Sequence, residues 1–294
     1  MEPRITALPT GADVLGESPV WDVANGTLYW VDQMRETVRS FQPASGASRD
    51  WPVPQIPGSV ALAQEGQLLL ALADGFHLLD LTSSACTAFA AVQHGGPGVR
   101  MNDGRSDRSG RYVGGSIVFG RAEPDGCLYR LNEDGRVEVL QRGIVVANSV
   151  CFNAAGDRLY YADSRAGTIL VCDYDPNGSE VGEPRVFADT RPHGSVPDGA
   201  TVDADGCVWV ALIENGRVLR LRPDGALDRT LQLPVPYVTS VCFGGPAMDV
   251  LYVTSVSDTG MRLRTDHPDA GTLFAVTGLG VKGVPEGRFK MRER

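Results

Sequence analysis

Residues 198–211 read DGATVDADGCVWVA, and this stretch carries the plan on which the chain is built. It starts with a polar and a small residue, Asp198-Gly199, continues into a short apolar run, and turns at Asp205-Gly206. Glycine suits this turn because it accepts the positive φ that hairpins require. Residues 207–211 are rich in the branched and aromatic side chains that favour strands. The stretch therefore predicts a β-hairpin with a polar residue at its entrance.

Five further segments repeat this plan, each followed by a turn with glycine and a second strand-like run. Their first residues are Glu17, Gly58, Asn102, Asn148 and Thr239. With Asp198, these starts recur at intervals of roughly 40 to 50 residues, the length of one four-stranded propeller blade. Helix-length stretches with a 3.6-residue period do not interrupt them, which disfavours a parallel α/β fold. We expect an all-β fold, a six-bladed β-propeller with four antiparallel strands per blade.

The repeats extend along the chain, so residues 1–294 are predicted to form a single propeller domain. A propeller has to close its ring. The segment 4–8 is expected to do so by adding an outer strand to the last blade, beside residues 271–275. This closure would join the two ends of the repeat array.

The composition argues against several classes of partner. Charged residues make up 21% and apolar residues 43%, which is ordinary for a folded chain with a large core. A net charge of −9 provides no basic surface for nucleic acid. The N-terminus lacks an apolar signal segment, and no run approaches the roughly 20 apolar residues of a membrane span. We expect a cytoplasmic protein whose six cysteines, which lack zinc-site spacing, are reduced and mostly buried.

Equivalent positions of a propeller converge, because the first strand of every blade lines the central channel. Glu17, Asn102, Asn148 and Asp198 would then face a common axis. Close carboxylates repel in a partly desolvated cavity, and a bound cation removes that conflict. Oxygen ligands suit Ca²⁺, Mg²⁺ or Mn²⁺, although carboxylates also bind Zn²⁺ and Fe²⁺. Each residue alone is better explained as a turn cap, but their shared register favours a metal site.

Several stretches resemble the SMP-30/gluconolactonase/regucalcin-like family of sugar lactonases. Residues 15–21, LGESPVW, are similar to the family's Leu-Gly-Glu-Gly-Pro-x-Trp opening, and residues 100–104, RMNDG, to its Arg-x-Asn-Asp motif. Residues 196–199 together with 205–211 resemble its Pro-Asp-Gly and Gly-x-Leu-Trp-x-Ala pair. Residues 238–255 resemble its last blade, so the resemblance runs in family order along nearly the whole chain.

This resemblance implies an enzyme that hydrolyses a sugar lactone, a cyclic ester, to the sugar acid with one divalent cation in the channel. The family's Glu, Asn and Asp ligands carry over to Glu17, Asn148 and Asp198. Its substrate-orienting Arg and Asn carry over to Arg100 and Asn102. Among Ca²⁺, Zn²⁺, Mn²⁺, Mg²⁺ and Fe²⁺, we favour Ca²⁺ or Zn²⁺.

We expect Asp198 both to contact the cation and to act as general base for the attacking water, with a metal-bound hydroxide as the alternative nucleophile. The cation would polarise the lactone carbonyl, while Arg100 and Asn102 hold sugar hydroxyls or the ring oxygen. Two departures from the family bear on the substrate. Ser149 stands where the family usually has Gly, and residues 213–216, IENG, replace a Trp-Gly-Gly stretch.

Other polar residues are interpreted as structural. His193 is placed on a loop near the channel mouth, and the histidines without mutual metal-ligand spacing are His77, His94 and His267. The serines beside ring positions that lack a Gly-x-Ser-x-Gly elbow are Ser18, Ser149 and Ser240. A phosphotriesterase of the diisopropyl-fluorophosphatase or paraoxonase type is the second enzyme hypothesis. A non-catalytic, protein-binding propeller is the third, although it leaves the converging oxygen atoms unexplained.

Overall fold

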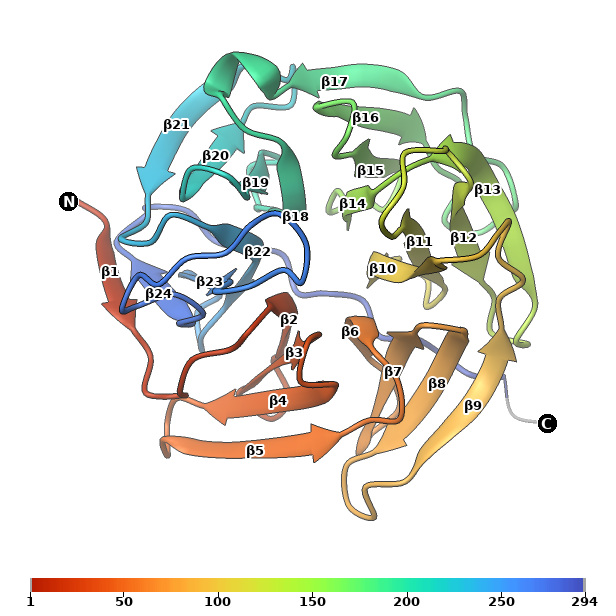
Figure 1. Ribbon diagram of the computed structural model, residues 1–294, viewed down its shortest axis with the longest axis horizontal. Helices are drawn as coiled ribbons and strands as arrows, with labels where there is room; N and C mark the ends of the chain where they lie inside the picture. Colours follow the sequence, from red (N-terminus) through yellow and green to blue (C-terminus); the bar gives the residue numbers. More distant parts are fainter. Residues whose placement is uncertain (1, 293–294) are drawn as a thin grey trace.

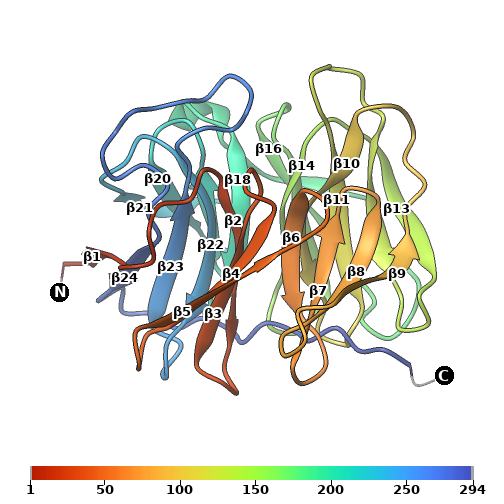
Figure 2. The ribbon, with the colours of Figure 1, turned by 60° about the horizontal axis from the view of Figure 1, so that its bottom comes forward.

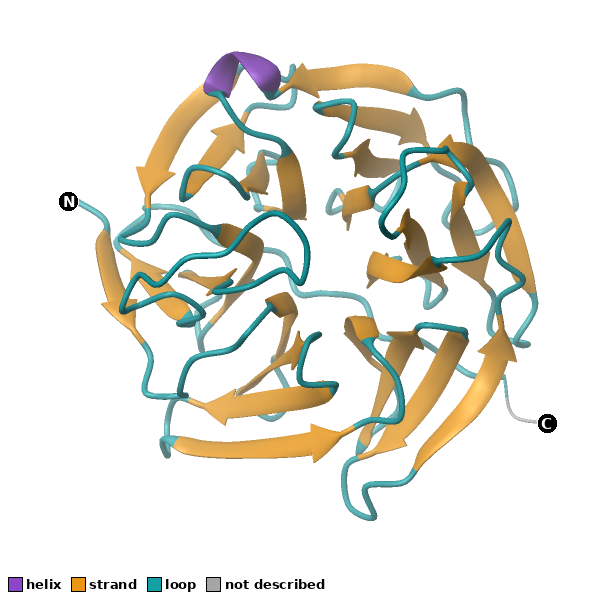
Figure 3. Ribbon diagram, in the orientation of Figure 1, coloured by secondary structure: helices purple, strands orange, loops and turns teal. Residues whose placement is uncertain are grey.

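The structure, a computed structural model, describes residues 2–292 as six four-stranded antiparallel sheets arranged in a ring (Figure 1). The predicted all-β fold, a six-bladed β-propeller, is therefore confirmed. Strands and the loops between them make up nearly all of the molecule (Figure 3). Within residues 2–292 the helical structure is one 3₁₀ turn, η1 (Arg191–His193), which has neither the length nor the apolar character needed to cross a membrane.

The first strand of each blade lies nearest the axis, and its partners follow outward (Figure 1). Blades 1 and 2 are β2 (Gly16–Asp22), β3 (Thr27–Asp32), β4 (Thr37–Gln42) and β5 (Ala47–Pro52), then β6 (Pro57–Leu62), β7 (Gln67–Leu72), β8 (Gly75–Asp80) and β9 (Cys86–Ala91). Blades 3 and 4 are β10 (Val99–Ser106), β11 (Tyr112–Val118), β12 (Gly126–Leu131) and β13 (Val137–Ile144), then β14 (Ala147–Phe152), β15 (Arg158–Asp163), β16 (Thr168–Asp173) and β17 (Arg185–Asp189). Blades 5 and 6 are β18 (Pro197–Val202), β19 (Val208–Leu212), β20 (Arg217–Leu221) and β21 (Leu227–Gln232), then β22 (Val238–Gly244), β23 (Val250–Ser255), β24 (Phe274–Thr277) and β1 (Arg4–Ala7).

Neighbouring blades pack face to face through apolar side chains that alternate along the strands. Between blades 5 and 6, Trp209 and Phe243 meet edge to face with ring centroids 5.7 Å apart. Between blades 6 and 1, Trp21 stacks on Tyr252 at 5.6 Å. All four rings are buried, so separating the blades would expose large aromatic surfaces to water. This packing holds the first strands, and the polar residues on them, at fixed places around the axis.

The N-terminal strand closes the ring as expected from the sequence. β1 pairs antiparallel with β24, from Arg4 opposite Thr277 to Ala7 opposite Phe274. β24 begins three residues later than the predicted 271–275 segment, because Gly271 adopts a φ of +80° and lies against the backbone of Asp13. The first and last parts of the described chain therefore share one sheet.

A second closing segment, the tail of residues 278–292, was not predicted from the sequence. It crosses the face of the ring opposite the loops that enter the first strands (Figure 2). Backbone N–H groups of the tail donate to carbonyls of three blades, from Gly283 to Met248 at 2.7 Å, from Phe289 to Leu62 at 2.7 Å and from Lys290 to Gly110 at 2.8 Å. The tail thus connects blade 6 with blades 2 and 3 on the far side of the ring.

Deleting residues 2–8 is expected to lower the free energy of unfolding by about 2–4 kcal/mol, because the β1 ladder and the contacts of Ile5 and Leu8 with the core are lost. Denaturant unfolding measures this change. Arg4→Gln, which leaves the β1 backbone intact, serves as the control and should stay within about 0.5 kcal/mol of wild type. Equal stability of the deletion variant and the wild-type protein would contradict closure by β1.

Candidate functional site

In every blade the pairing between the first and second strands shifts register once, through a bulge. The bulge includes the residue that begins the blade's repeat or lies next to it. In blade 1 the break lies between Glu17 and Val20. The breaks in the other five blades lie between Pro57 and Ser59, Met101 and Gly104, Asn148 and Cys151, Pro197 and Ala200, and Val238 and Val241. Such bulges bend a strand and re-aim its side chains, and they are common beside active sites. The residues that begin the six repeats, polar in every blade except at Gly58 of blade 2, thus sit at irregular points around the channel.

The residues at these bulges also bind each blade to the next. Hydrogen bonds cross five of the six junctions: Val60 N to Ser18 Oγ at 3.1 Å, Ser59 Oγ to Asn102 O at 2.7 Å, Val150 N to Asp103 Oδ2 at 2.9 Å, Ser149 Oγ to Asp198 O, and Thr239 Oγ1 to Gly16 O. At the remaining junction, a Cβ added to Gly199 would lie 1.9 Å from Ser240 Oγ. Only glycine permits that approach, so blades 5 and 6 are joined by close packing instead.

Two of these bulge residues hold a backbone conformation that favours glycine. Ser18 has a φ of +50° and Ser149 a φ of +57°, at a cost on the order of 1 kcal/mol each. Both serines are fully buried, and both hydroxyls bond the next blade. Serine at position 149 therefore keeps the backbone conformation that a glycine would adopt, and it adds a hydrogen bond to the carbonyl of Asp198.

The carboxamides of blades 3 and 4 are in direct contact. Asn102 Nδ2 donates to Asn148 Oδ1 at 3.0 Å and to Ala147 O at 2.9 Å. Asn148 Nδ2 in turn donates to Ser164 Oγ at 2.8 Å. These bonds fix which way both amides face, and Asn148 Oδ1 keeps a second lone pair for a further partner.

The two predicted carboxylate ligands come from blades 1 and 5 and are deeply buried. Glu17 is 8% exposed and Asp198 is 4% exposed. Burial, followed by the nearby charge of Asp103, raises the pKa of Glu17 to about 8. Burial also raises the pKa of Asp198 well above its ordinary range, with further contributions from Glu17 and Asp103. The charge of Glu17 therefore opposes the ionisation of Asp198, a conflict that a bound cation would relieve.

Arg100 is partly buried beside Glu17 and is held by a residue that the sequence analysis missed. Its guanidinium donates to Gln33 Oε1 at 3.0 Å and to Met101 O at 2.9 Å, while Gln33 Nε2 donates to Gly58 O at 3.1 Å. Burial lowers the pKa of Arg100 to about 10, and Glu17 partly offsets that effect. Gln33 follows β3 directly, and no local sequence pattern marks its contact with blade 3.

Asp103 is the second residue missed, although it stands in the Arg-x-Asn-Asp motif. Its Oδ2 accepts the Val150 N–H, whereas its buried Oδ1 has no hydrogen-bond partner among residues 2–292. An unpartnered carboxylate oxygen beside Glu17 and Asp198 adds negative charge that these side chains do not neutralise. The donor set of Glu17, Asn148 and Asp198 consists of oxygen atoms alone and suits a hard divalent cation.

The other polar residues take structural roles. His77 bonds Asp74 at 2.8 Å and His94 bonds the Ala73 carbonyl at 2.9 Å. His193 closes η1, where its carbonyl accepts from Asn215. Over the described part of the chain, no three His, Cys, Asp or Glu residues gather as a metal site, and the candidate set contains only two such residues beside Asn148. All six cysteines are free, and five are buried.

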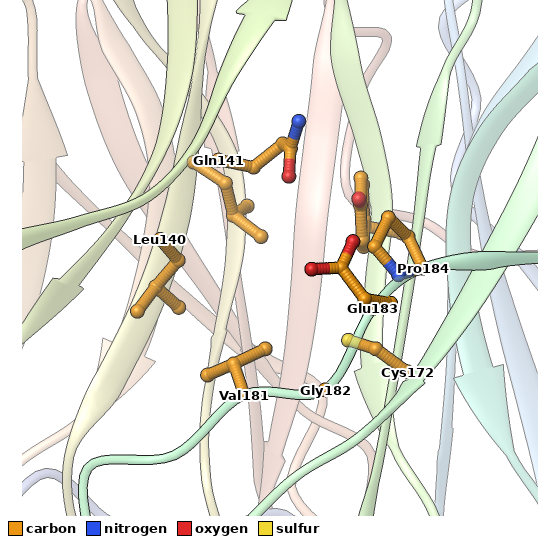
Figure 4. A pocket seen from close by; sticks show the side chains of 9 residues that line it. Leu140, Gln141, Cys172, Val181, Gly182, Glu183 and Pro184 are labelled. Atoms are coloured by element: carbon orange, nitrogen blue, oxygen red, sulfur yellow. The ribbon is translucent and has the colours of Figure 1, made fainter.

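A separate pocket lies between blades 3 and 4, away from the channel strands. Figure 4 shows the Glu183 carboxylate pointing into it, near Gln141 and Cys172, with Leu140 and Val181 on the opposite side. Burial raises the pKa of the Cys172 thiol to about 11, which leaves it protonated and unreactive at neutral pH. The pocket offers no set of converging polar groups comparable to that around Glu17 and Asp198.

Comparisons with known proteins show a family that this chain matches along most of its length. The SMP-30/gluconolactonase/LRE-like region matches residues 15–257. Regucalcin of Gallus gallus is 35% identical over 281 residues, covering 92% of this chain and 93% of that protein. The 6-deoxy-6-sulfogluconolactonase of Pseudomonas putida is 32% identical over 277 residues, covering 94% and 95%. The crystal structure of a calcium-binding protein, regucalcin, from Agrobacterium tumefaciens strain C58 is similar with a TM-score of 0.87 at 29% identity, covering 98% of this chain and 96% of its own.

The raised pKa of Glu17 predicts how the stability of the chelated protein depends on pH. The folded state binds this proton more tightly than the unfolded state, whose carboxyl has the ordinary value of 4.5. Stability is therefore highest below pH 4.5 for this group and is lost as the pH rises to about 8, by an amount on the order of a few kcal/mol. Denaturant unfolding in excess chelator between pH 5 and pH 8 measures the slope.

Glu17→Gln should reduce this slope, because its amide does not ionise, while Asp198 and Asp103 keep their own contributions. The exposed Glu65→Gln should keep the wild-type slope and is the matched control. A wild-type profile that is flat, or that rises with pH, would contradict the burial of an unneutralised Glu17.

Proposed function

Because the chain belongs to the SMP-30/gluconolactonase/LRE-like family, we propose that it hydrolyses a sugar lactone to the sugar acid with one divalent cation bound in its channel. The observation that carries this proposal is the burial of two carboxyls, Glu17 of blade 1 and Asp198 of blade 5, with the charge of Glu17 opposing the ionisation of Asp198. Asn148 of blade 4, fixed by Asn102, completes an oxygen-only set. The names of the relatives in Pseudomonas putida and Agrobacterium tumefaciens support the lactone and the cation, respectively.

Glu17, Asn148 and Asp198 would hold the cation, and Ca²⁺ is favoured over Zn²⁺ because the set lacks nitrogen and sulfur ligands. When bound, such a cation polarises the lactone carbonyl as a Lewis acid, an effect worth several kcal/mol. The attraction of each carboxylate to a dication would outweigh the repulsion between them, so both carboxyls would be deprotonated in the loaded enzyme.

Asp198 is proposed as the general base. Water adds to the ester carbonyl and gives a tetrahedral intermediate, and the bond from the carbonyl carbon to the ring oxygen then breaks to leave a carboxylic acid and a hydroxyl. Asp198 takes a proton from the attacking water and returns it to the departing ring oxygen. Burial and the charge of Glu17 raise the pKa of Asp198 in the metal-free protein, and the cation would lower it, so that Asp198 would be ionised and able to accept this proton.

Arg100 and Asn102 are proposed to orient the sugar. Both N–H groups of Asn102 are used by Ala147 O and Asn148 Oδ1, so its Oδ1 remains to accept a bond from a sugar hydroxyl. Arg100 keeps N–H groups beyond those bonded to Met101 and Gln33, and these can donate to the ring oxygen or to a second hydroxyl. One acceptor beside several donors matches a polyhydroxylated lactone, and Gln33 holds the guanidinium in that orientation.

Asp198→Asn removes the base while keeping the size of the side chain. We expect kcat/KM for gluconolactone to fall by about 10³-fold or more, with the far-ultraviolet circular dichroism spectrum unchanged. Asp249→Asn, which alters an exposed carboxyl in the turn between β22 and β23, is the matched control and should retain full activity. Turnover close to wild type in Asp198→Asn would remove its assignment as base.

Acid release from gluconolactone and xylonolactone tests the reaction and its cation together. Chelated protein should be inactive, and Ca²⁺, Mg²⁺, Mn²⁺, Zn²⁺ and Fe²⁺ are restored one at a time, with Ca²⁺ expected to activate. An organophosphate ester is assayed in parallel. Hydrolysis of that ester without lactone hydrolysis would favour a phosphotriesterase, and full lactonase activity in the chelated protein would contradict the role of the cation.

A further inference from the structure

Arg105 is a fully buried arginine in the channel, three residues beyond Asn102 on β10. Its side chain is 1% exposed. Nη1 donates to Pro19 O at 2.8 Å, and Nη2 donates to Ala200 O at 3.1 Å and to Val241 O at 3.4 Å. One side chain of blade 3 therefore reaches the first strands of blades 1, 5 and 6.

The carbonyls that Arg105 binds occupy corresponding places. Pro19 is two residues beyond Glu17, and Ala200 is two residues beyond Asp198. Both carbonyls lie in or directly beside the bulges that carry the two buried carboxyls. The guanidinium is thus a direct link between the backbones of the two strands whose carboxyls would share a cation, across a channel where no strand pairing joins them.

The charge of Arg105 is balanced partly by the tail. Its Nε lies 3.7 Å from Glu286 Oε1, and Glu286 Oε2 lies 3.7 Å from Arg108 Nη1. Thr201 Oγ1 donates to the same carboxylate at 3.3 Å. Burial alone would lower the pKa of Arg105, but Glu286 and Asp103 raise it above its ordinary value, so the guanidinium stays charged.

The tail holds Glu286 in this place from both sides. The carbonyl of Pro285 accepts from Arg108 at 2.7 Å, and Arg288 is anchored to the Ala63 carbonyl at 2.9 Å and to Asp22 at 3.0 Å. Glu286 belongs to the tail, which crosses the face of the ring opposite the entry loops (Figure 2). The Glu286 carboxylate is 7% exposed, and a carboxylate this deeply buried needs a cationic partner, which Arg105 and Arg108 provide.

We propose that Arg105 is a positioning residue for the cation site, setting the separation of the strands that bear Glu17 and Asp198, with Glu286 as its counter-ion. This inference rests on the proposed function, because it assigns Arg105 to the same cation. Arg105 does not touch the cation or the lactone. Its effect passes through three backbone carbonyls, which a lysine cannot bind at once with the planar geometry of a guanidinium.

Arg105→Lys tests the proposal because it keeps the charge and removes the fork. Ca²⁺ affinity is measured by titration calorimetry, together with kcat, KM and the thermal midpoint. We expect the Kd for Ca²⁺ to rise by about tenfold or more and kcat at saturating Ca²⁺ to fall, with KM for the lactone changing less. Glu286→Gln should shift the Kd in the same direction by a smaller factor.

Arg220→Lys is the matched control, since Arg220 is 6% exposed and pairs with Asp203, Asp205 and Asp228 away from the bulges. It should lower the thermal midpoint and leave the Kd for Ca²⁺ unchanged. The positioning role would be overturned if Arg105→Lys kept the wild-type Kd and kcat, or if Arg105→Lys and Arg220→Lys changed the Kd equally. Either result would leave the proposed function standing. Wild-type protein that binds Ca²⁺ but hydrolyses no lactone would defeat the proposed function, and the two Kd values would still decide the role of Arg105. Wild-type protein that binds no divalent cation would overturn both.

Discussion

Six strands line one channel, and each leaves its hydrogen-bonded ladder at the same step to meet the strand of the next blade. This shared bulge is the constraint on which the rest of the structure depends. It frees Ser18, Ser59, Asp103, Ser149 and Thr239 to bond the neighbouring blade, while Gly199 allows the closest approach. The same step brings polar side chains that are far apart in the chain to one region of the channel.

The channel also concentrates buried charge, which is stable only when it is paired. Asp103, Glu17 and Asp198 are negative when ionised, and the pKa values of all three are raised chiefly by burial. Glu286 lies 3.7 Å from Arg105, whereas Arg100 and Arg105 offset the burial of Glu17 only in part. Asp198 keeps a raised pKa beside the charges of Glu17 and Asp103. This remaining negative charge supports the proposal that a cation binds with Glu17 and Asp198.

The sequence predicted those features that a local pattern of residues marks and missed those that depend on contacts between distant strands. Turn glycines, strand composition and the spacing of repeat starts were enough for six blades, and a strand-like segment near Arg4 was enough for the closure by β1. The bulges were not predicted, because a register break depends on pairing between strands. Gln33, Arg105 and Glu286 were missed for a related reason. Their partners lie 67, 86 and 181 residues away, and no local pattern records a contact across a closed ring.

The roles of Glu17, Asn148, Asp198, Arg100 and Asn102 stay predictions, as does the assignment of residues 1–294 to one domain. Crystals soaked in Mn²⁺ offer the most direct test, because anomalous scattering locates the ion without any assumption about its ligands. One strong peak is predicted, bounded by the carboxylates of Glu17 and Asp198 and by the amide oxygen of Asn148. Saturating Mn²⁺ that gives no peak there, or a peak held by other residues, would contradict a cation shared by these three side chains.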